Sequence, residues 1–279
     1  MPPIHRRDQA MPLRTLLVHG DADSQMPVRM SLATDVARRH HAKLLVIFAL
    51  QGRSAAFLYA QHAPADVVSR QIRAERLRAA RIGARLADRA ARAGIGLAWR
   101  AIEGRPDTVL AQQAAAADML VLSQDSDDAA SPLVAPVTLA AGKPVLCVPR
   151  GGPFASCGRR VLLAWNGSRE AARAAHDARP FLRQAERVIL FTADDETSAG
   201  TSAEDAASHL AADGISVEIQ RAPLNRRDPG QAILGAASDH GVDLVVMGAY
   251  GHSRLREWAF GGATRTVLRS MAVPTLLSY

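Results

Sequence analysis

Two short apolar stretches, DMLVLS at Asp118–Ser123 and DLVVMG at Asp243–Gly248, lie 125 positions apart and decide how the fold is read. Each follows an Ala-rich segment of helical character, Pro106–Ala116 in the first case and Pro229–His240 in the second. Strands that are apolar throughout and alternate with helices are typical of a parallel sheet covered on both faces. The near-repeat therefore predicts an internally duplicated α/β unit.

The same order of elements recurs on both sides of these stretches. First strands are expected at Leu13–His19 and Arg160–Trp165, and last strands at Lys143–Pro149 and Val273–Ser278. Each half then reads β-α-β-α-β-α-β-α-β, which predicts two tandem five-stranded parallel-sheet α/β domains at residues 12–150 and 159–279. We expect the two last strands to meet, so that one chain mimics a dimer; a homodimer of whole chains stays open.

Composition bounds the class of protein. The 279 residues are 48% hydrophobic but only 4% aromatic, so the cores must be built from Ala, Leu, Val and Ile. No apolar run approaches the ~20 residues of a membrane helix, and residues 1–14 hold no apolar segment of signal-peptide length. Two cysteines are too few for a disulfide scaffold. The sequence predicts a soluble cytoplasmic protein without a membrane partner.

Positive charge is concentrated in one predicted helix of the first half. Residues 1–150 carry 20 Lys and Arg against 13 Asp and Glu, whereas residues 151–279 are balanced. One helical face from Ser69 to Arg92 carries Arg70, Arg78, Arg81, Arg85, Arg89 and Arg92, and the other carries Val68, Ile72, Ala79, Ile82, Leu86 and Ala90. A solvated surface is the simpler interpretation, and an anionic partner is the alternative. No aromatic residues interleave the arginines, which argues against nucleic acid.

A candidate ligand loop follows the fourth strand of the second half. It runs Gly248-Ala-Tyr-Gly251, nine further residues, and then Gly261-Gly262-Ala-Thr264 at the start of a helix. Glycines let backbone approach a phosphate, and free amides at a helix start favour an anion. The alternative is that these glycines only shape a turn and pack a helix.

This loop resembles the nucleotide-binding signature of universal stress proteins. The opening VLLAWNGSREAARAA at Val161–Ala175 and the closing GGATRTVLRSMAVPTLLS at Gly261–Ser278 are also similar to that family. The resemblance implies a tandem universal stress protein with a Rossmann-like fold. It also implies ATP or AMP binding without an established chemical step, with Mg²⁺ accompanying a triphosphate.

Carried over residue by residue, the resemblance implies one nucleotide site in the second half. Gly248, Gly251 and Gly261 match the phosphate-loop glycines, while Gly262 stands where the family usually has Ser or Thr. The expected site consists of Asn166, Phe191, Gly248, Gly251, His252, Gly261, Gly262 and Thr264. Asn166 replaces a common Asp, Phe191 would offer backbone to adenine, and Thr264 would offer a hydroxyl.

The first half lacks the glycine loop. Its fourth strand is followed by Gln124–Pro132, in which Asp125, Asp127 and Asp128 fall where phosphates would lie. Like charges ~4 Å apart repel by several kcal/mol, so this half is expected to reject a triphosphate unless a metal bridges the charges. A solvated acidic loop and a metal site are the two interpretations.

Two functions from different classes follow. The first is a nucleotide-binding stress-response or regulatory protein; the alternative is an interaction module whose arginine helix docks an acidic partner. The chain has no P-loop Gly-Lys-Ser/Thr, so enzymatic activity is expected to be slow ATP hydrolysis at most.

Four single residues carry lesser expectations. Ser168 is predicted to cap a helix, His40 to belong to a polar helix end, Cys147 to lie in the core and Cys157 to be an exposed linker thiol.

Overall fold

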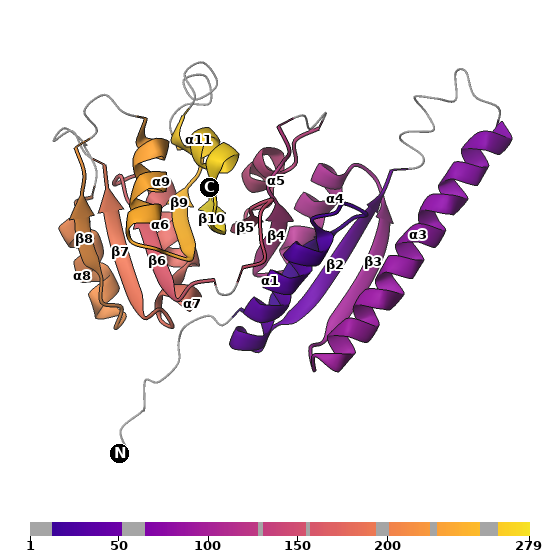
Figure 1. Cartoon of the computed structure of the whole chain (residues 1–279), viewed down its shortest axis with the longest axis horizontal. Coiled ribbons are helices and arrows are strands. Elements are labelled where there is room, and N and C mark those ends of the chain that lie inside the picture. Colours follow the sequence, from indigo (N-terminus) through magenta and orange to yellow (C-terminus); the bar gives the residue numbers. More distant parts are fainter. Residues whose placement is uncertain are drawn as a thin grey trace.

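The computed structural model describes residues 13–51, 65–127, 131–154, 157–193, 201–223, 228–251 and 262–279. Within these residues, ten strands form one continuous sheet with helices on both faces (Figure 1). The strand order is β3-β2-β1-β4-β5-β10-β9-β6-β7-β8. Each half therefore contributes five neighbouring strands in the same internal order, as the duplicated sequence pattern predicts.

The first half begins at β1. Its strands are β1 (Thr15–Gly20), β2 (Lys43–Leu50), β3 (Leu97–Glu103), β4 (Met119–Ser123) and β5 (Val145–Val148). Its helices are α1 (Met26–His40), α3 (Ala65–Arg92), α4 (Pro106–Gln113) with the 3₁₀ turn η1 (Ala114–Ala116), and α5 (Val134–Ala140).

The second half repeats this order with shorter helices. Its strands are β6 (Arg160–Ala164), β7 (Arg187–Thr192), β8 (Glu218–Arg221), β9 (Leu244–Gly248) and β10 (Thr275–Ser278). Its helices are α6 (Arg169–Asp177), α7 (Arg179–Leu182), α8 (Ala203–Ala212), α9 (Pro229–Asp239) and α11 (Ala263–Ser270).

The halves join edge to edge at the middle of the sheet. Strands β5 and β10 pair antiparallel, with Leu146 opposite Leu276, while all the other pairs are parallel. The predicted meeting of the last strands is confirmed. Gln124 strengthens this junction: its Nε2 donates to the carbonyls of Leu268 (2.7 Å) and Arg269 (3.1 Å) at the end of α11.

Two apolar cores, one on each face of the sheet, run across both halves. Alternate residues of β1 show the division, since Leu16 and Val18 enter one core and Leu17 enters the other. The first core is covered by α1, α6, α7 and α8, and the second by α4, α5, α9 and α11. Because both cores are continuous across the junction, the halves bury apolar surface against each other.

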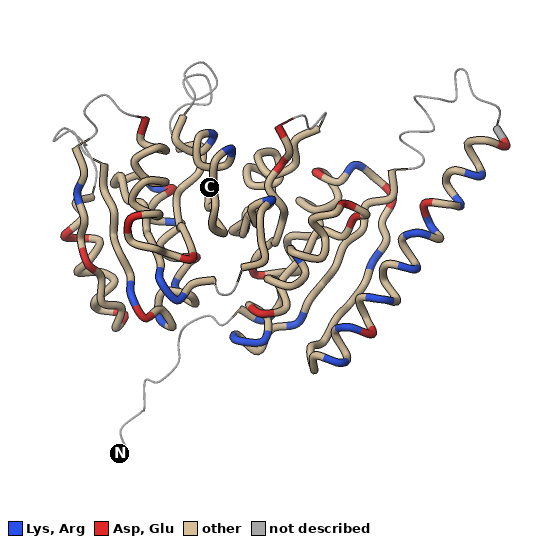
Figure 2. Tube along the Cα trace, in the orientation of Figure 1, with Lys and Arg blue, Asp and Glu red and all other residues tan. Residues whose placement is uncertain are grey.

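Helix α3 is much longer than the strand beside it. Its 28 residues span ~42 Å, whereas the seven residues of β3 span ~23 Å. Gly83 fixes the contact, since a Cβ there would lie 2.7 Å from the Trp99 ring. Figure 1 shows α3 reaching past the sheet, and Figure 2 shows Lys and Arg recurring along it.

Several local expectations can be checked directly. Ser168 caps α6 as predicted, because its hydroxyl accepts the Ala171 amide at 3.2 Å. Cys147 is buried in the core as predicted. Cys157 is also fully buried, so the expectation of an exposed linker thiol is wrong. Burial raises the pKa of the Cys157 thiol well above its ordinary value, which keeps it protonated and unreactive.

The helices in the described ranges are too short or too polar to cross a membrane.

Candidate functional site

The candidate nucleotide site lies at the carboxyl ends of β6 and β9. These strands are neighbours at the centre of the second half, with Leu163 beside Val246. From β6 the chain crosses outward to β7, and β9 lies on the opposite side of β6. Such a reversal of strand order leaves a crevice where α/β proteins commonly bind ligands.

Asn166 is exposed directly beyond β6 and shapes the turn into α6. Its Oδ1 accepts the Ser168 amide at 3.2 Å and the Ser168 hydroxyl at 2.7 Å. The carboxamide oxygen is therefore used locally. The NH₂ group has no partner among the residues described, so it is the part of Asn166 that remains for a ligand.

Gly248 and Gly251 both lie against the first turn of α6. A Cβ at Gly248 would come within 2.6 Å of the Glu170 and Ala171 backbone, and one at Gly251 within 2.6 Å of Glu170 Oε2. Between them, Tyr250 has the left-handed conformation, with φ 58°. Close packing on α6 is therefore sufficient to explain both glycines, whatever ligand the loop holds.

Glu170 is a functional candidate that the sequence did not reveal. Its side chain is buried, and its carboxylate pairs with the exposed guanidinium of Arg169. Arg169 also lies over the Tyr279 ring, 5.8 Å from its centroid. A carboxylate beneath Gly251 places negative charge at the floor of the loop, which opposes a highly charged phosphate chain.

Thr264 and Gly262 form the start of α11. Gly262 is the N-cap, with extended backbone, and its carbonyl accepts the amides of Arg265 and Thr266. Thr264 is buried, and its hydroxyl oxygen accepts the Tyr250 amide at 3.3 Å. Thr264 thus ties the glycine loop to α11, and its hydroxyl proton is the part left for a ligand.

Phe191 lies at the end of β7, within the second core. Its carbonyl accepts the Trp165 amide at 2.8 Å, so this backbone acceptor is already used in the sheet. The remaining expected site residues, His252 and Gly261, lie outside the described residues. The structure thus places Gly248 and Gly251 against α6, and the contact between Tyr250 and Thr264 connects the same loop to the start of α11.

The first half has different residues at the corresponding points. Strand registers place Asp21 at the position of Asn166 and Ser123 at the position of Gly248. Between them lies Arg29 of α1, which is 1% exposed. Its guanidinium donates to the His19 carbonyl (2.9 Å) and the Ser123 hydroxyl (2.6 Å) and pairs with Asp21 (2.8 Å).

Arg29 and Glu170 therefore place opposite charges near the corresponding strand ends of the two halves, although they are not at matching positions of their helices. Each comes from the helix that follows the first strand, and each packs against the end of the fourth strand. A buried cation favours an anionic ligand nearby, and a buried carboxylate disfavours one. The first half has therefore not simply lost a site for an anion, because it holds a buried cation where the second half holds a buried carboxylate.

The acidic loop of the first half also has a structural use. The Asp125 carboxylate accepts the amides of Leu133 (2.8 Å) and Val134 (3.1 Å) at the start of α5. Burial raises the pKa of Asp125, while these two amides act in the opposite direction. Asp125 thus occupies the N-terminus of α5, the place in this half that corresponds to the expected phosphate position.

The other two carboxylates of this loop are separate from it. Asp127 lies 3.8 Å from Arg269 of the second half, and Asp128 falls outside the described residues. No cluster of three metal-binding side chains occurs in the described part of the chain.

Comparison with known proteins agrees with this architecture. The family model described as "Universal stress protein family" matches residues 158–278. The second half of this chain is therefore similar to the universal stress protein family along nearly its whole length. Universal stress protein Slr1230 of Synechocystis is 44% identical over 46 residues, which is 16% of either protein, so the chain matches only a small part of that relative.

Solved structures show the same fold in both halves. The alignment with a universal stress protein from Archaeoglobus fulgidus covers 95% of this chain and 95% of that protein's chain, with 16% sequence identity and a TM-score of 0.77. The alignment with a universal stress protein family protein from Arabidopsis thaliana, solved with AMP bound, covers 50% of this chain and 93% of that protein's chain. The sequence identity is 14% and the TM-score is 0.36. The chain is thus an α/β protein with two universal stress protein-like halves.

Proposed function

We propose that the second half binds an adenine nucleotide at the crevice between β6 and β9, and that binding serves a regulatory role in stress response. The observation that carries the proposal is the convergence of three features at one switch point. These are the exposed Asn166, the Gly248–Gly251 turn and the start of α11 at Gly262. They lie within the residues matched by the family model.

The fit favours few phosphate charges. The N-terminus of the eight-residue α11 offers amides and a positive dipole end to an anion. The Glu170 carboxylate opposes additional phosphate charges, although its ion pair with Arg169 offsets part of that repulsion. AMP is therefore expected to bind more tightly than ATP without Mg²⁺.

Gly262 gives a test that does not endanger folding. Its φ of −48° and ψ of 157° suit an Asp or Ser N-cap, so either substitution should stabilise α11 by roughly a few tenths of a kcal/mol. Gly262→Asp places a carboxylate where a phosphate would bind and should weaken AMP binding at least tenfold. Gly262→Ser supplies the hydroxyl common in the family and should preserve or strengthen it.

Binding is measured by calorimetry, and nucleotide released from the denatured, purified protein is identified by mass. If neither AMP nor ATP binds the parent at millimolar concentration, the proposal is wrong. If the parent and Gly262→Asp bind AMP with equal affinity, the AMP site does not lie at the start of α11. Slow hydrolysis, checked in the same samples by release of phosphate, would add an activity to the proposed site.

A further inference from the structure

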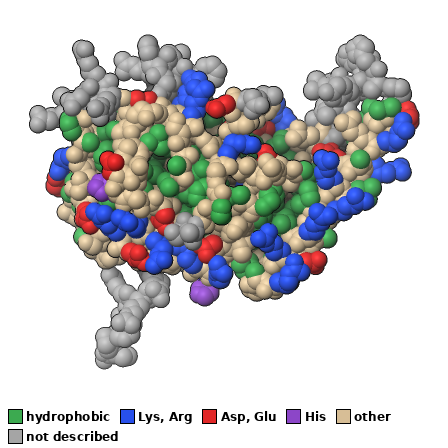
Figure 3. Space-filling view, in the orientation of Figure 1, with side chains coloured by type: hydrophobic (Ala, Val, Ile, Leu, Met, Phe, Trp, Pro, Cys, Tyr) green, Lys and Arg blue, Asp and Glu red, His purple; other side chains and the backbone are tan. Residues whose placement is uncertain are grey.

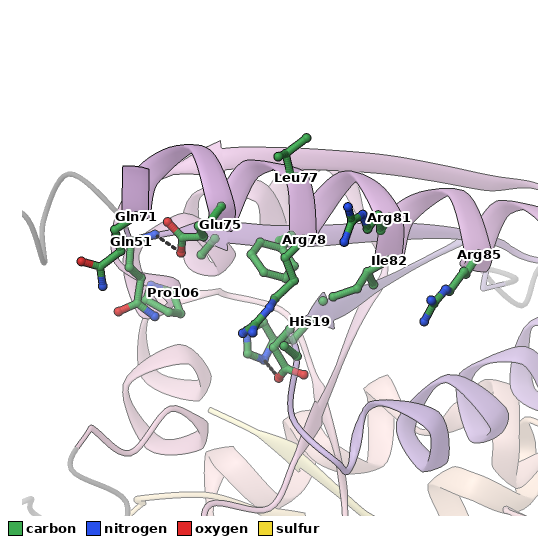
Figure 4. A pocket seen from close by; sticks show the side chains of 16 residues that line it. His19, Gln51, Gln71, Glu75, Leu77, Arg78, Arg81, Ile82, Arg85 and Pro106 are labelled. Atoms are coloured by element: carbon green, nitrogen blue, oxygen red, sulfur yellow. Dashed lines mark hydrogen bonds and ion pairs between the residues drawn. The ribbon is translucent and has the colours of Figure 1, made fainter. Parts of the chain in front are cut away.

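A cavity of about 920 Å³ lies in the first half, between α3 and the carboxyl ends of β1 and β2 (Figure 4). This α3 cavity is walled on the helix side by Gln71, Glu75, Arg78, Arg81, Ile82 and Arg85. On the sheet side it meets His19 and Asp21 beyond β1, and Phe48 and Ala49 on β2. Its volume is within the range of small-molecule sites.

Three arginines of α3 line the cavity without a described partner. Arg78, Arg81 and Arg85 form neither a hydrogen bond nor an ion pair with residues in the described ranges. Arg70 and Arg76 on the same helix, by contrast, pair with Asp66 and Glu103. Figure 4 shows Arg78 extending from α3 toward His19.

The acidic groups of the lining are already engaged. Asp21 pairs with the buried Arg29 at 2.8 Å and with His19 at 3.2 Å. Glu75 accepts the Gln51 amide at 3.0 Å. His19 adds no charge near neutral pH, because burial and then the nearby Arg29 lower its pKa to about 4. Glu75 keeps its negative charge, but the three arginines outnumber it and leave the lining with a net positive charge.

The wall between the arginines and the sheet is partly apolar. Phe48 and Ala49 come from β2, Ile82 from α3 and Pro106 from the start of α4. Such a wall suits a ring or short aliphatic body, while guanidinium groups suit a phosphate, sulfonate or carboxylate. Figure 3 shows basic and apolar side chains side by side over this end of the molecule.

We infer that the α3 cavity binds a small organic anion that joins an apolar body to one acidic group. This site is separate from the proposed nucleotide site: it lies in the other half, uses no glycine loop, and neighbours the Arg29 cation rather than the Glu170 carboxylate. Part of the arginine face expected to be a solvated surface thus becomes the wall of a binding site.

The test uses 8-anilinonaphthalene-1-sulfonate, an aryl sulfonate whose fluorescence rises in an apolar site, with the full chain. The background is Gly262→Asp, so that an anion site in the second half does not contribute. The triple change Arg78→Gln, Arg81→Gln and Arg85→Gln keeps helix propensity while removing three charges from the cavity. We expect one site per chain and a dissociation constant at least tenfold higher in this variant.

The matched control is Arg73→Gln, Arg89→Gln and Arg92→Gln. These residues are exposed, as the three cavity arginines are, but they lie outside the cavity lining, so this variant should change the dissociation constant less than twofold. Equal weakening in both triple variants would show general attraction to a basic helix and overturn the site. Failure of the probe to bind saturably would also overturn it, while AMP binding to the parent would still report on the second half.

Discussion

Replacing Arg29 with Met tests whether the buried cation holds the ends of β1 and β4 together. Met keeps most of the side-chain volume, so the main loss is the guanidinium and its contacts. Those contacts are the His19 carbonyl at 2.9 Å, the Ser123 hydroxyl at 2.6 Å and the Asp21 carboxylate at 2.8 Å. The two strand ends would lose the one side chain that contacts both through these bonds.

The expected loss of unfolding free energy is about 3 kcal/mol. Removing one partner of a buried pair typically costs ~3–5 kcal/mol, because the other charge is left without compensation. Asp21 is 25% exposed, so water recovers part of that cost and the lower end of the range applies. Arg38→Met is the control on the same helix: its pair with Asp35 is exposed and should contribute less than about 1 kcal/mol.

Urea unfolding followed by circular dichroism measures both variants. A second readout is the pKa of His19 by NMR, which should rise in Arg29→Met, since Arg29 helps to lower it and Asp21 acts the other way. The reasoning is refuted if Arg29→Met destabilises no more than Arg38→Met and the His19 pKa stays unchanged.

Two further predictions concern the junction between the halves. His40 is buried against Phe181 across the junction. Burial, and then the nearby Arg39 and His41, lower the pKa of His40 to about 4 from an ordinary value of 6.5. The contribution of neutral His40 to the unfolding free energy is therefore fully present above pH 6.5 and is lost as the pH falls toward 4. Urea unfolding at pH 7 and 4.5 should show that His40 accounts for about 2 kcal/mol of the unfolding free energy lost on acidification. The His40→Leu variant should therefore lose about 2 kcal/mol less than the parent between these pH values. An equal loss in both proteins would contradict the lowered pKa of His40. Gln124→Ala removes two hydrogen bonds to α11 and one from the Arg150 amide, and should cost about 2 kcal/mol in the same assay, whereas Gln113→Ala on exposed α4 should cost little. Equal costs would mean that Gln124 does not hold the junction.

Regular elements and their order could be predicted because their signals are local and periodic. Apolar runs such as Asp243–Gly248 specify buried parallel strands, and the 3.6-residue pattern of Ser69–Arg92 places Ala79 and Ala90 on the buried face of α3. Their repetition also predicted the edge at which the halves meet. These features depend on which side chains avoid water, which sequence periodicity reports directly.

Element ends were predicted less well. The sequence pattern of Arg169–Leu182 by itself favours one helix, but the structure has α6 and α7 separated at Ala178. Pro180 lies in the first turn of α7, where its missing amide is tolerated, whereas inside a continuous helix it would remove a hydrogen bond. The proline was a usable signal for this break.

The charged groups of the site could not be predicted by the same reasoning. Arg29 and Glu170 occupy first-turn helix positions, where charged side chains ordinarily face water. Their burial depends on residues about 80 to 95 positions away, Ser123 and Gly248. Asp125 likewise bonds to amides eight and nine residues ahead, beyond the reach of a capping motif. Only the assembled sheet brings these groups together.

The tandem arrangement explains how opposite charges arise near the corresponding strand ends of the two halves. In a symmetric homodimer both sites carry the same residues, so a substitution that suits one ligand is imposed on both. In this chain the halves share two cores and the β5–β10 junction, yet Arg29 and Glu170 belong to separate sites. One half can therefore hold a cation and the other a carboxylate without loss of the common fold. We expect ligand charge to be discriminated between the halves, with the more anionic ligand at the Arg29 side, and this follows whichever molecules the two sites bind.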